Sequence, residues 1–220
     1  MQDSGTSKDH TLGLAALAVC ALLWSLAGLF IKIIDWHPMA IAGSRSAVAG
    51  LFLITWIRRP RITLSFPQIG AALSSAATML LFVHANKATT SANAILLQYG
   101  APIYTAILGI FLLREKPRIE HFAAFLAVAG GMVLFFLGDL GSGSLGGDLA
   151  AVASGVTFAM YYVFLRMQKD GSPLESNLLA HGLTAVFALT WSCFLPAPRI
   201  TVGSGAAILV LGIFQVGLAA

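Results

Sequence analysis

Long runs of uncharged, mostly apolar residues constrain this chain more than any other feature. Residues 12–31 contain no charged side chain, and neither do residues 62–83 or 88–113. An α-helix rises about 1.5 Å per residue, so about 20 apolar residues cross the hydrocarbon core of a bilayer. The runs lack the alternation of period two that marks the strands of a membrane barrel. Helices satisfy their own backbone groups in lipid, so the sequence predicts an all-α polytopic membrane protein.

Charged residues are scarce and separate the apolar runs from one another. They make up 10% of the chain, against about 25% in soluble domains. The expected membrane segments are about 12–34, 38–57, 67–86, 91–113, 120–137, 147–165, 175–195 and 203–220. The Gly- and Ser-rich stretch 138–147 is the only candidate linker in the sequence. We therefore expect eight membrane helices with one linker after the fifth.

The second and seventh segments resemble copies of one unit. Pro38 and Trp56 stand 18 residues apart, as do Pro173 and Trp191, and each Trp follows a Phe-x-x-Thr sequence. Aligned pairs in the preceding segments, at an offset of 134, are Gly13/Gly147, Ala16/Ala150, Phe30/Phe164 and Lys32/Arg166. A period of this length indicates a duplicated unit. A unit with an odd number of crossings inserts its two copies in opposite orientations, as in many secondary transporters.

The repeat divides the chain into four parts. We expect a cytoplasmic tail (1–11), a first five-helix repeat (12–137), the linker (138–147) and an incomplete second repeat (148–220). At the repeat offset Ala220 corresponds to Ala85, so counterparts of the fourth and fifth segments are missing. The expectation is therefore a C-terminally truncated form that has eight of the ten helices of two inverted five-helix repeats.

Lysine and arginine predict the orientation. The N-terminal tail and the connections after the second, fourth and sixth segments hold nine of these residues, and the other connections hold three. Basic residues near segment ends stay in the cytoplasm. We therefore expect a multi-pass protein of the inner (plasma) membrane with a cytoplasmic amino terminus. The basic residues are scattered over short connections, so the net charge of +4 does not indicate nucleic-acid binding.

The chain resembles the EamA-type members of the drug/metabolite transporter superfamily. The residues that carry the resemblance are Pro38, Arg45, 81–82, Ala85, 89–94, Pro102 and 112–116. The resemblance implies a ten-helix permease of two inverted repeats that exports or imports amino acids, metabolites or drugs. The sequence departs from the family pattern at Ser25, where Gly is frequent after the Trp, and at Lys87, where an apolar or aromatic residue is frequent.

Arg45 has the highest expected free energy of membrane insertion among the residues of the predicted membrane segments. It lies seven residues after Pro38, or about 10 Å along the helix. A charge at depth in a membrane helix costs about 2.5–3.5 kcal/mol on insertion scales. Arg45 is therefore a candidate for binding substrate in a cavity or for gating. The alternative is a structural residue bonded to backbone carbonyls or extended toward the interface.

The fourth segment contains a second candidate site. Gln98, Tyr99 and Pro102 lie near its middle, and Pro102 cannot donate a hydrogen bond to the carbonyl of Gln98. An interrupted membrane helix at this depth is typical of transporter binding sites, although a proline also kinks helices that only pack. Gln98 and Arg45 are expected at the same depth.

Other residues carry weaker indications. Trp24 falls near the middle of the first segment and could line a cavity or pack against lipid, whereas Tyr161 and Tyr162 are expected in the aromatic belt at the membrane interface. His84 is a candidate cavity residue; it and His181 could relay protons or could be packed bundle histidines. Glu115, after the fourth segment, is read as a topology signal or a cytoplasmic gate.

These features favour a permease over two other classes. We expect a small-molecule substrate, contact with the lipid bilayer, no cofactor, no metal and, as one option, pairing of two copies. The alternatives are a fragment that does not transport and an intramembrane enzyme. The sequence lacks the paired aspartates or membrane-embedded serine motif of such an enzyme, so we predict that the protein is not an enzyme.

Overall fold

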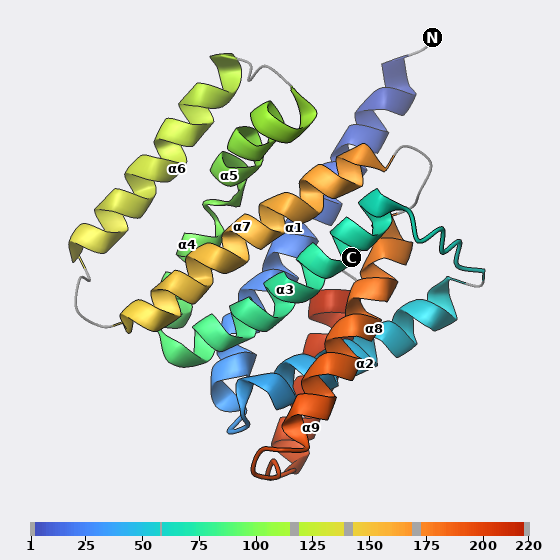
Figure 1. The fold of residues 1–220 in the computed structure, drawn as a ribbon. Helices are drawn as coiled ribbons and strands as arrows, with labels where there is room; N and C mark the ends of the chain where they lie inside the picture. Colours follow the sequence, from blue (N-terminus) through green and yellow to red (C-terminus); the bar gives the residue numbers. More distant parts are fainter. Residues whose placement is uncertain (1–2, 58, 115–118, 139–142, 169–172, 218–220) are drawn as a thin grey trace.

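The computed structural model describes residues 3–57, 59–114, 119–138, 143–168 and 173–217, and every regular element in these ranges is helical (Figure 1). In chain order the elements are α1 (Asp3–Ile33), α2 (Pro38–Trp56), α3 (Phe66–Ala88), α4 (Ser91–Gln98), α5 (Ala101–Leu108), η1 (Gly109–Leu113), α6 (Ile119–Gly138), α7 (Leu145–Met167), α8 (Pro173–Ser192), α9 (Val202–Val210) and η2 (Leu211–Gly217). The π-helical turns η1 and η2 continue α5 and α9 without a break. The all-α expectation is confirmed.

Helices lie over each of the eight expected segments. Within the described part of the chain, the helices long and apolar enough to cross a membrane are Pro38–Trp56, Phe66–Ala88, Ser91–Leu113 and Leu145–Met167. Shorter apolar stretches lie in α1, α6 and α9 with η2. The chain is therefore a multi-pass membrane protein, while the count of eight crossings stays a prediction.

Four helix starts are fixed by hydroxyl side chains. Ser65, Thr90, Ser144 and Thr201 each accept a hydrogen bond from the backbone N–H three residues later, at 3.0–3.4 Å. Serine and threonine are preferred at this position because they satisfy a donor that the first helical turn leaves free. These polar residues explain why α3, α4, α7 and α9 begin where the apolar segments begin.

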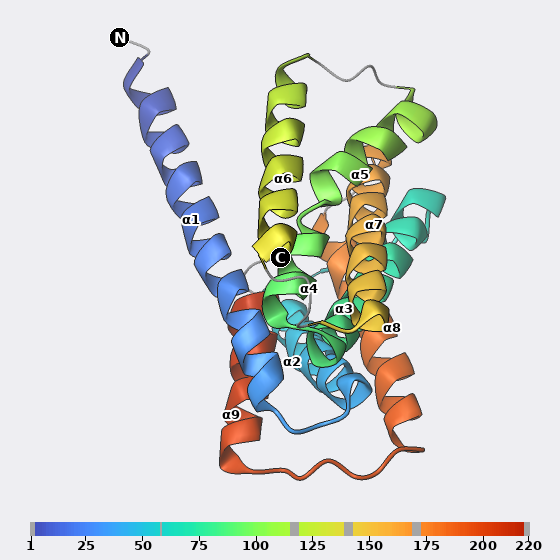
Figure 2. The same ribbon diagram turned by 90° about the vertical axis from the view of Figure 1, so that its left-hand side faces the viewer.

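Close helix packing forms the centre of the molecule. α3 packs along α7 and against α8, and α2 packs against α8, while α1 contacts η2. Small residues are buried in these contacts; among them are Ala71, Ala151, Ala180 and Ala188. Small side chains allow helix backbones to approach in lipid, where no hydrophobic force drives association. Figure 2 shows the first half of α1 standing apart from the bundle, with α6 between it and α5 in this view.

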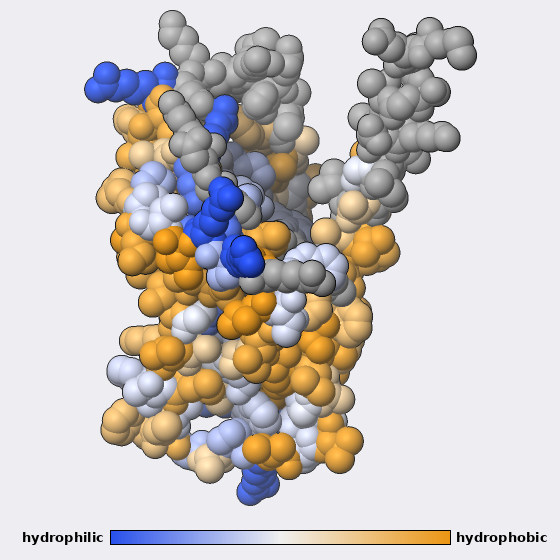
Figure 3. All heavy atoms as spheres, turned by 90° about the vertical axis from the view of Figure 1, so that its right-hand side faces the viewer, coloured by the Kyte–Doolittle hydropathy of each residue, from blue (hydrophilic) through white to orange (hydrophobic). Residues whose placement is uncertain are grey.

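Apolar side chains dominate part of the surface. Hydrophobic residues cover most of the lower half of the face in Figure 3, while hydrophilic residues gather in the upper half and at the lowest point. Large apolar residues such as Leu51, Leu73 and Val186 are more than half exposed. Such a surface suits lipid contact.

The connections between helices separate onto two ends of the bundle. At the lower end in Figure 2, Trp36 donates from Nε1 to the carbonyl of Arg199 at 2.8 Å, joining the α1–α2 and α8–α9 connections. At the same end Lys32 donates to the carbonyl of Thr89 at 2.7 Å, which brings in the α3–α4 connection. We call this the Trp36 end.

The α2–α3 connection lies at the opposite end. There the backbone N–H of Arg61 donates to Oε1 of Glu175, in the first turn of α8, at 2.8 Å. The hydroxyl of Ser176 donates to Oε1 of Gln168, just after α7, at 2.9 Å. We call this the Glu175 end. The division matches the alternation of helix directions that the basic residues predict.

The duplicated segments share one local geometry. Phe52 and Trp56 stack at the end of α2 with ring centroids 6.0 Å apart and planes at 28°. Phe187 and Trp191 stack near the end of α8 at 6.1 Å and 30°. The spacing of four residues brings both rings onto one face of each helix, so the sequence repeat is also a repeat of side-chain arrangement.

Candidate functional site

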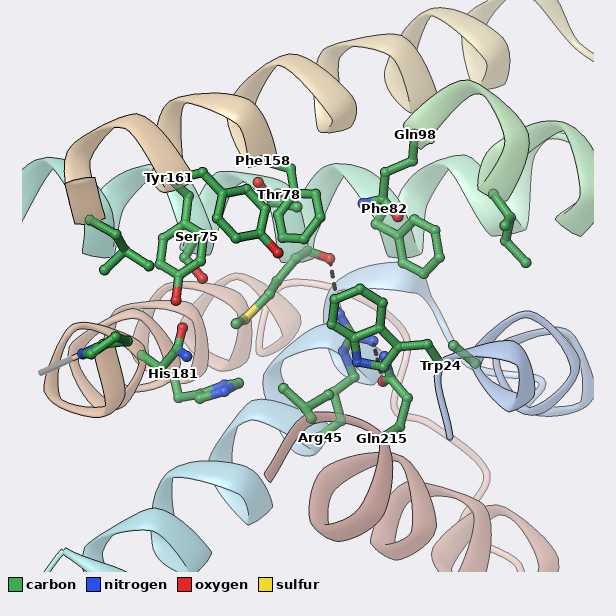
Figure 4. Close-up of a pocket in the computed structure, with 18 of the residues that line it drawn as sticks. Trp24, Arg45, Ser75, Thr78, Phe82, Gln98, Phe158, Tyr161, His181 and Gln215 are labelled. Carbon is green, nitrogen blue, oxygen red and sulfur yellow. Dashed lines mark hydrogen bonds between the residues drawn. The ribbon is translucent and has the colours of Figure 1, made fainter. Parts of the chain in front are cut away.

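A cavity of about 360 Å³ lies among α1, α2, α3, α4, α7, α8 and η2 (Figure 4). Helices from before and after residue 143 therefore contribute to one space. Its wall contains apolar and aromatic side chains, with a few polar groups between them. That volume falls within the range of about 300–1,000 Å³ that is usual for small-molecule pockets.

Arg45 carries the only formal charge among the described residues that line the cavity. Its side chain is 2% exposed. Nη1 donates to Oε1 of Gln215 at 3.3 Å, and Nη2 donates to the carbonyl of Met79 at 3.4 Å. Both bonds are long, and Nε has no partner among the described residues. A buried guanidinium normally has its donors satisfied, so Arg45 has unused hydrogen-bonding capacity beside the cavity.

His181, on α8, is the second buried polar group with unused capacity. It is 1% exposed, and neither Nδ1 nor Nε2 has a hydrogen-bond partner. Figure 4 shows His181 and Arg45 on the same side of the cavity. Gly50 of α2 lies next to it, since a Cβ added there would be in ordinary contact with the Cβ of His181, at 3.6 Å. The α2–α8 contact therefore brings these two nitrogen-bearing groups together.

Aromatic rings form much of the opposite wall. Trp24 meets Phe158 edge to face at 6.0 Å, and Phe158 lies 4.8 Å from Tyr162 and 6.3 Å from Tyr161 between ring centroids. Figure 4 places Phe158 and Tyr161 across the cavity from Arg45. Such rings favour apolar and unsaturated ligands.

The helix break predicted in the fourth segment is present. α4 ends at Gln98, and α5 begins at Ala101, with Pro102 in its first turn. Nε2 of Gln98 donates to the hydroxyl of Ser154 on α7 at 3.0 Å. A Cβ added to Gly155 would lie 3.2 Å from the carbonyl oxygen of Gln98. The break thus fixes Gln98 against α7 at the cavity wall.

The two ends of the bundle differ around the cavity. Lining residues extend to Leu165 and to Pro173, near the Glu175 end. At the Trp36 end, Thr89 donates to Oδ1 of Asp148 at 2.7 Å, and Nδ2 of Asn93 lies 3.3 Å from the same oxygen. These three residues, which we call the Asp148 cluster, join α3, α4 and α7, and none of them lines the cavity. No described residue of the connections at the Trp36 end lines the cavity.

The structure brings together four of the residues singled out from the sequence. Trp24, Arg45, Gln98 and Tyr99 line the cavity, so Arg45 and Gln98 share one space as well as one depth. The other two lie elsewhere: His84 is exposed on α3, and Pro102 is exposed on α5. Glu115 lies outside the described residues.

Several lining residues were not predicted from the sequence to belong to the cavity. Tyr161 and Tyr162, which were expected in the aromatic belt, line it. His181, Asn177 and Gln215 also belong to the wall. Gln215 lies in η2, and π-helical turns are frequent at functional sites. The sequence contains one signal for Gln215: it is the only amide or charged residue in the last expected membrane segment, 203–220.

Comparison with known proteins identifies the relatives of this chain. The model of the EamA-like transporter family matches residues 11–137. Solute carrier family 35 member G1 of Mus musculus is 28% identical over 175 residues, covering 70% of this chain and 47% of that protein. The chain thus spans about half the length of this curated relative.

A solved crystal structure has the same fold. It superimposes with a TM-score of 0.70 at 21% sequence identity and covers 93% of this chain and 75% of the other. At that identity the likeness concerns the fold alone.

Proposed function

The chain belongs to the EamA-like transporter family, and from this premise we propose that it is a permease that moves a small solute by alternating access. Members of this family are membrane transporters and not enzymes. The proposed substrate site is the cavity around Arg45, with Trp24, Gln98 and Tyr99 on its wall. The proposed membrane is the inner (plasma) membrane, with the amino terminus in the cytoplasm.

The position of the cavity carries this proposal. Both halves of the chain line it, and its lining residues extend toward the Glu175 end, whereas no described residue of the connections at the Trp36 end lines it. A transporter must expose one site to each side in turn. A cavity that both halves of the chain line, and that lies nearer to one end of the bundle than to the other, supports such a cycle.

The contact pattern supports two inverted repeats, 12–137 and from 148 onward. The offset of the repeat pairs α1 with α7, α2 with α8, and α3 with α9 and η2. If each helix is replaced by its counterpart in the other repeat, the α3–α8 contact corresponds to the contact of α2 with α9 and η2. Both contacts are present. The α3–α7 contact likewise corresponds to that of α1 with η2 and α9, which is present too. A pseudo-twofold axis through the α2–α8 contact accounts for all of these pairs.

Sided labelling of the cavity tests the alternating-access proposal. Cys20 and Cys193 are free thiols, so the background is Cys20→Ala with Cys193→Ser. Ser75 lines the cavity, while Leu73, on the same helix, is 55% exposed on the apolar surface. We expect Ser75→Cys in proteoliposomes to react with a membrane-impermeant thiosulfonate from the Glu175 side, and Leu73→Cys to stay unreactive.

A transported solute should then increase labelling of Ser75→Cys from the opposite side. Flux of a labelled metabolite panel, measured in the same vesicles, should fall at least tenfold in Arg45→Gln and stay unchanged in Arg59→Gln, the same change at an exposed arginine. Labelling from one side only, whatever solute is added, together with no flux, would reject the permease and favour a chain that does not transport.

A further inference from the structure

The unpaired nitrogen groups of the cavity identify the chemistry of its ligand. Nε of Arg45 and both ring nitrogens of His181 are buried without partners, and both side chains are at least 98% buried by their exposed fractions of 2% and 1%. Buried polar groups in proteins are almost always hydrogen-bonded. Nε of Arg45 and the one N–H of a neutral imidazole are donors, and the other imidazole nitrogen is an acceptor. Two unpaired donors from two helices therefore indicate a binding position for an oxygen-bearing ligand group.

The charge balance of the wall determines the sign of that group. Among the described residues that line the cavity there is no aspartate or glutamate, so the guanidinium of Arg45 has no counter-charge there. Gln215 and Met79 supply only neutral oxygens, at 3.3 and 3.4 Å. A carboxylate would supply the missing charge and accept shorter hydrogen bonds, and planar guanidinium matches carboxylate geometry better than any other side chain does.

The remainder of the wall describes the body of the ligand. Aromatic rings from α1 and α7 face Arg45, and they prefer unsaturated or apolar groups. The same rings could attract an organic cation. Arg45 disfavours a cationic ligand, because its positive charge lies in the same cavity of about 360 Å³ and no described lining residue neutralises it. The wall therefore favours an anion over a cation of the same shape.

We propose that the transported solute is a small organic carboxylate with an aromatic or apolar body, bound through its carboxylate at Arg45 and His181. This inference rests on the proposed permease function and names its substrate class. The carboxylate accepts from Nε of Arg45 and from the protonated ring nitrogen of His181. The body lies against the aromatic wall that Trp24, Phe158 and Tyr162 form, and Gln98 and Asn177 bind further polar substituents.

A matched series of ligands tests the substrate class on the full chain. 3-Phenylpropanoate, 3-phenylpropanamide and 3-phenylpropylamine share one body and differ only in the head group. We expect calorimetry in lipid nanodiscs to show the carboxylate binding at least tenfold more tightly than the amide, since hydrogen bonds to charged groups contribute more than neutral ones. The amine should bind more weakly than the amide.

Variants connect the preference to Arg45. Arg45→Gln should bring the carboxylate to the affinity of the amide, Arg45→Lys should retain part of the preference, and Arg59→Gln should keep all of it. Size-exclusion profiles and thermal melting establish that each variant is folded. If Arg45→Gln does not fold, the affinities of the three ligands for the unchanged chain and for Arg45→Lys test the proposal instead.

Two results would overturn the proposal. One is an amide or amine that binds as tightly as the carboxylate, and the other is the absence of carboxylate binding. If sided labelling of Ser75→Cys still changes with another solute in that case, the permease function stands and only the substrate class is wrong.

Discussion

At the scale of single residues, the Asp148 cluster joins three helices through polar contacts. Thr89 is 4% exposed and Asn93 is 2% exposed, and both direct their donors at one oxygen of Asp148. Lys32 donates to the Thr89 carbonyl, and Lys87 donates to the carbonyl of Ile34. Reciprocal contacts between the ends of α1 and α3 therefore surround the cluster. The departure from the family pattern at Lys87 has a structural role here.

Thr89→Val should destabilise the protein because it removes the shorter hydrogen bond to the Asp148 carboxylate. The expected loss is about 1.5–3 kcal/mol, the range for hydrogen bonds to charged groups. Thr55→Val is the matched control, since Thr55 is exposed and its hydroxyl bonds only within its own helix at 2.7 Å. Unfolding by denaturing detergent measures both variants. Equal stability of the two would show that the cluster contributes nothing to folding.

At the scale of elements, the α3–α7 contact depends on a glycine in the first turn of α7. A Cβ added to Gly147 would lie 2.8 Å from the backbone nitrogen and from the Cβ of Thr89, and 2.9 Å from the backbone carbon of Ala88. These backbone atoms cannot relieve the close contact by changing rotamer, as a side chain can. The end of α3 and the start of α7 therefore meet at a distance that only glycine allows.

Gly147→Ala should separate these two helix ends and lower stability by about 1–3 kcal/mol, the usual cost of overpacking. The neighbouring Gly146 has nothing within 4 Å of an added Cβ. Gly146→Ala should therefore stay within about 0.5 kcal/mol of the unchanged chain. The same detergent titration compares them, and a loss of equal size in both variants would refute the role assigned to the α3–α7 contact.

At the scale of the whole molecule, the two ends of the bundle should face opposite sides of the membrane. The Trp36 end carries the α1–α2 and α8–α9 connections, joined by the bond from Trp36 to Arg199. The Glu175 end carries the α2–α3 connection, which contains Arg59 and Arg61. Basic residues concentrate at the cytoplasmic side, so the Glu175 end is expected inside.

Native Cys193 offers a direct measurement of this orientation. It is exposed just after α8, near the Trp36 end. In a Cys20→Ala background, a membrane-impermeant maleimide should label Cys193 in intact spheroplasts. Arg59→Cys with Cys193→Ser should be labelled only after permeabilisation. The reverse pattern would place the amino terminus outside and contradict the orientation inferred from the charges.

The sequence alone determined the class of fold and the approximate bounds of most of its helices, although α1 begins at Asp3, inside the expected tail. Uncharged runs of 20 residues or more admit only membrane helices, and hydroxyl residues such as Thr90 and Ser144 mark the starts that the structure shows. Pro102 predicted the break between α4 and α5. These features are local: each depends on a single residue or on the polarity of one continuous segment.

Only the tertiary structure decided which residues share the cavity. Arg45 and Gln98 could be placed at one depth from residue counts, but their facing depends on how α2 and α4 rotate against α7 and α8. The apolar character of every segment hides that rotation, because a helix that is apolar on all sides carries no stripe to orient it. His181 and Gln215 come from distant helices, and only the packing of α8 and η2 brings them to the guanidinium of Arg45.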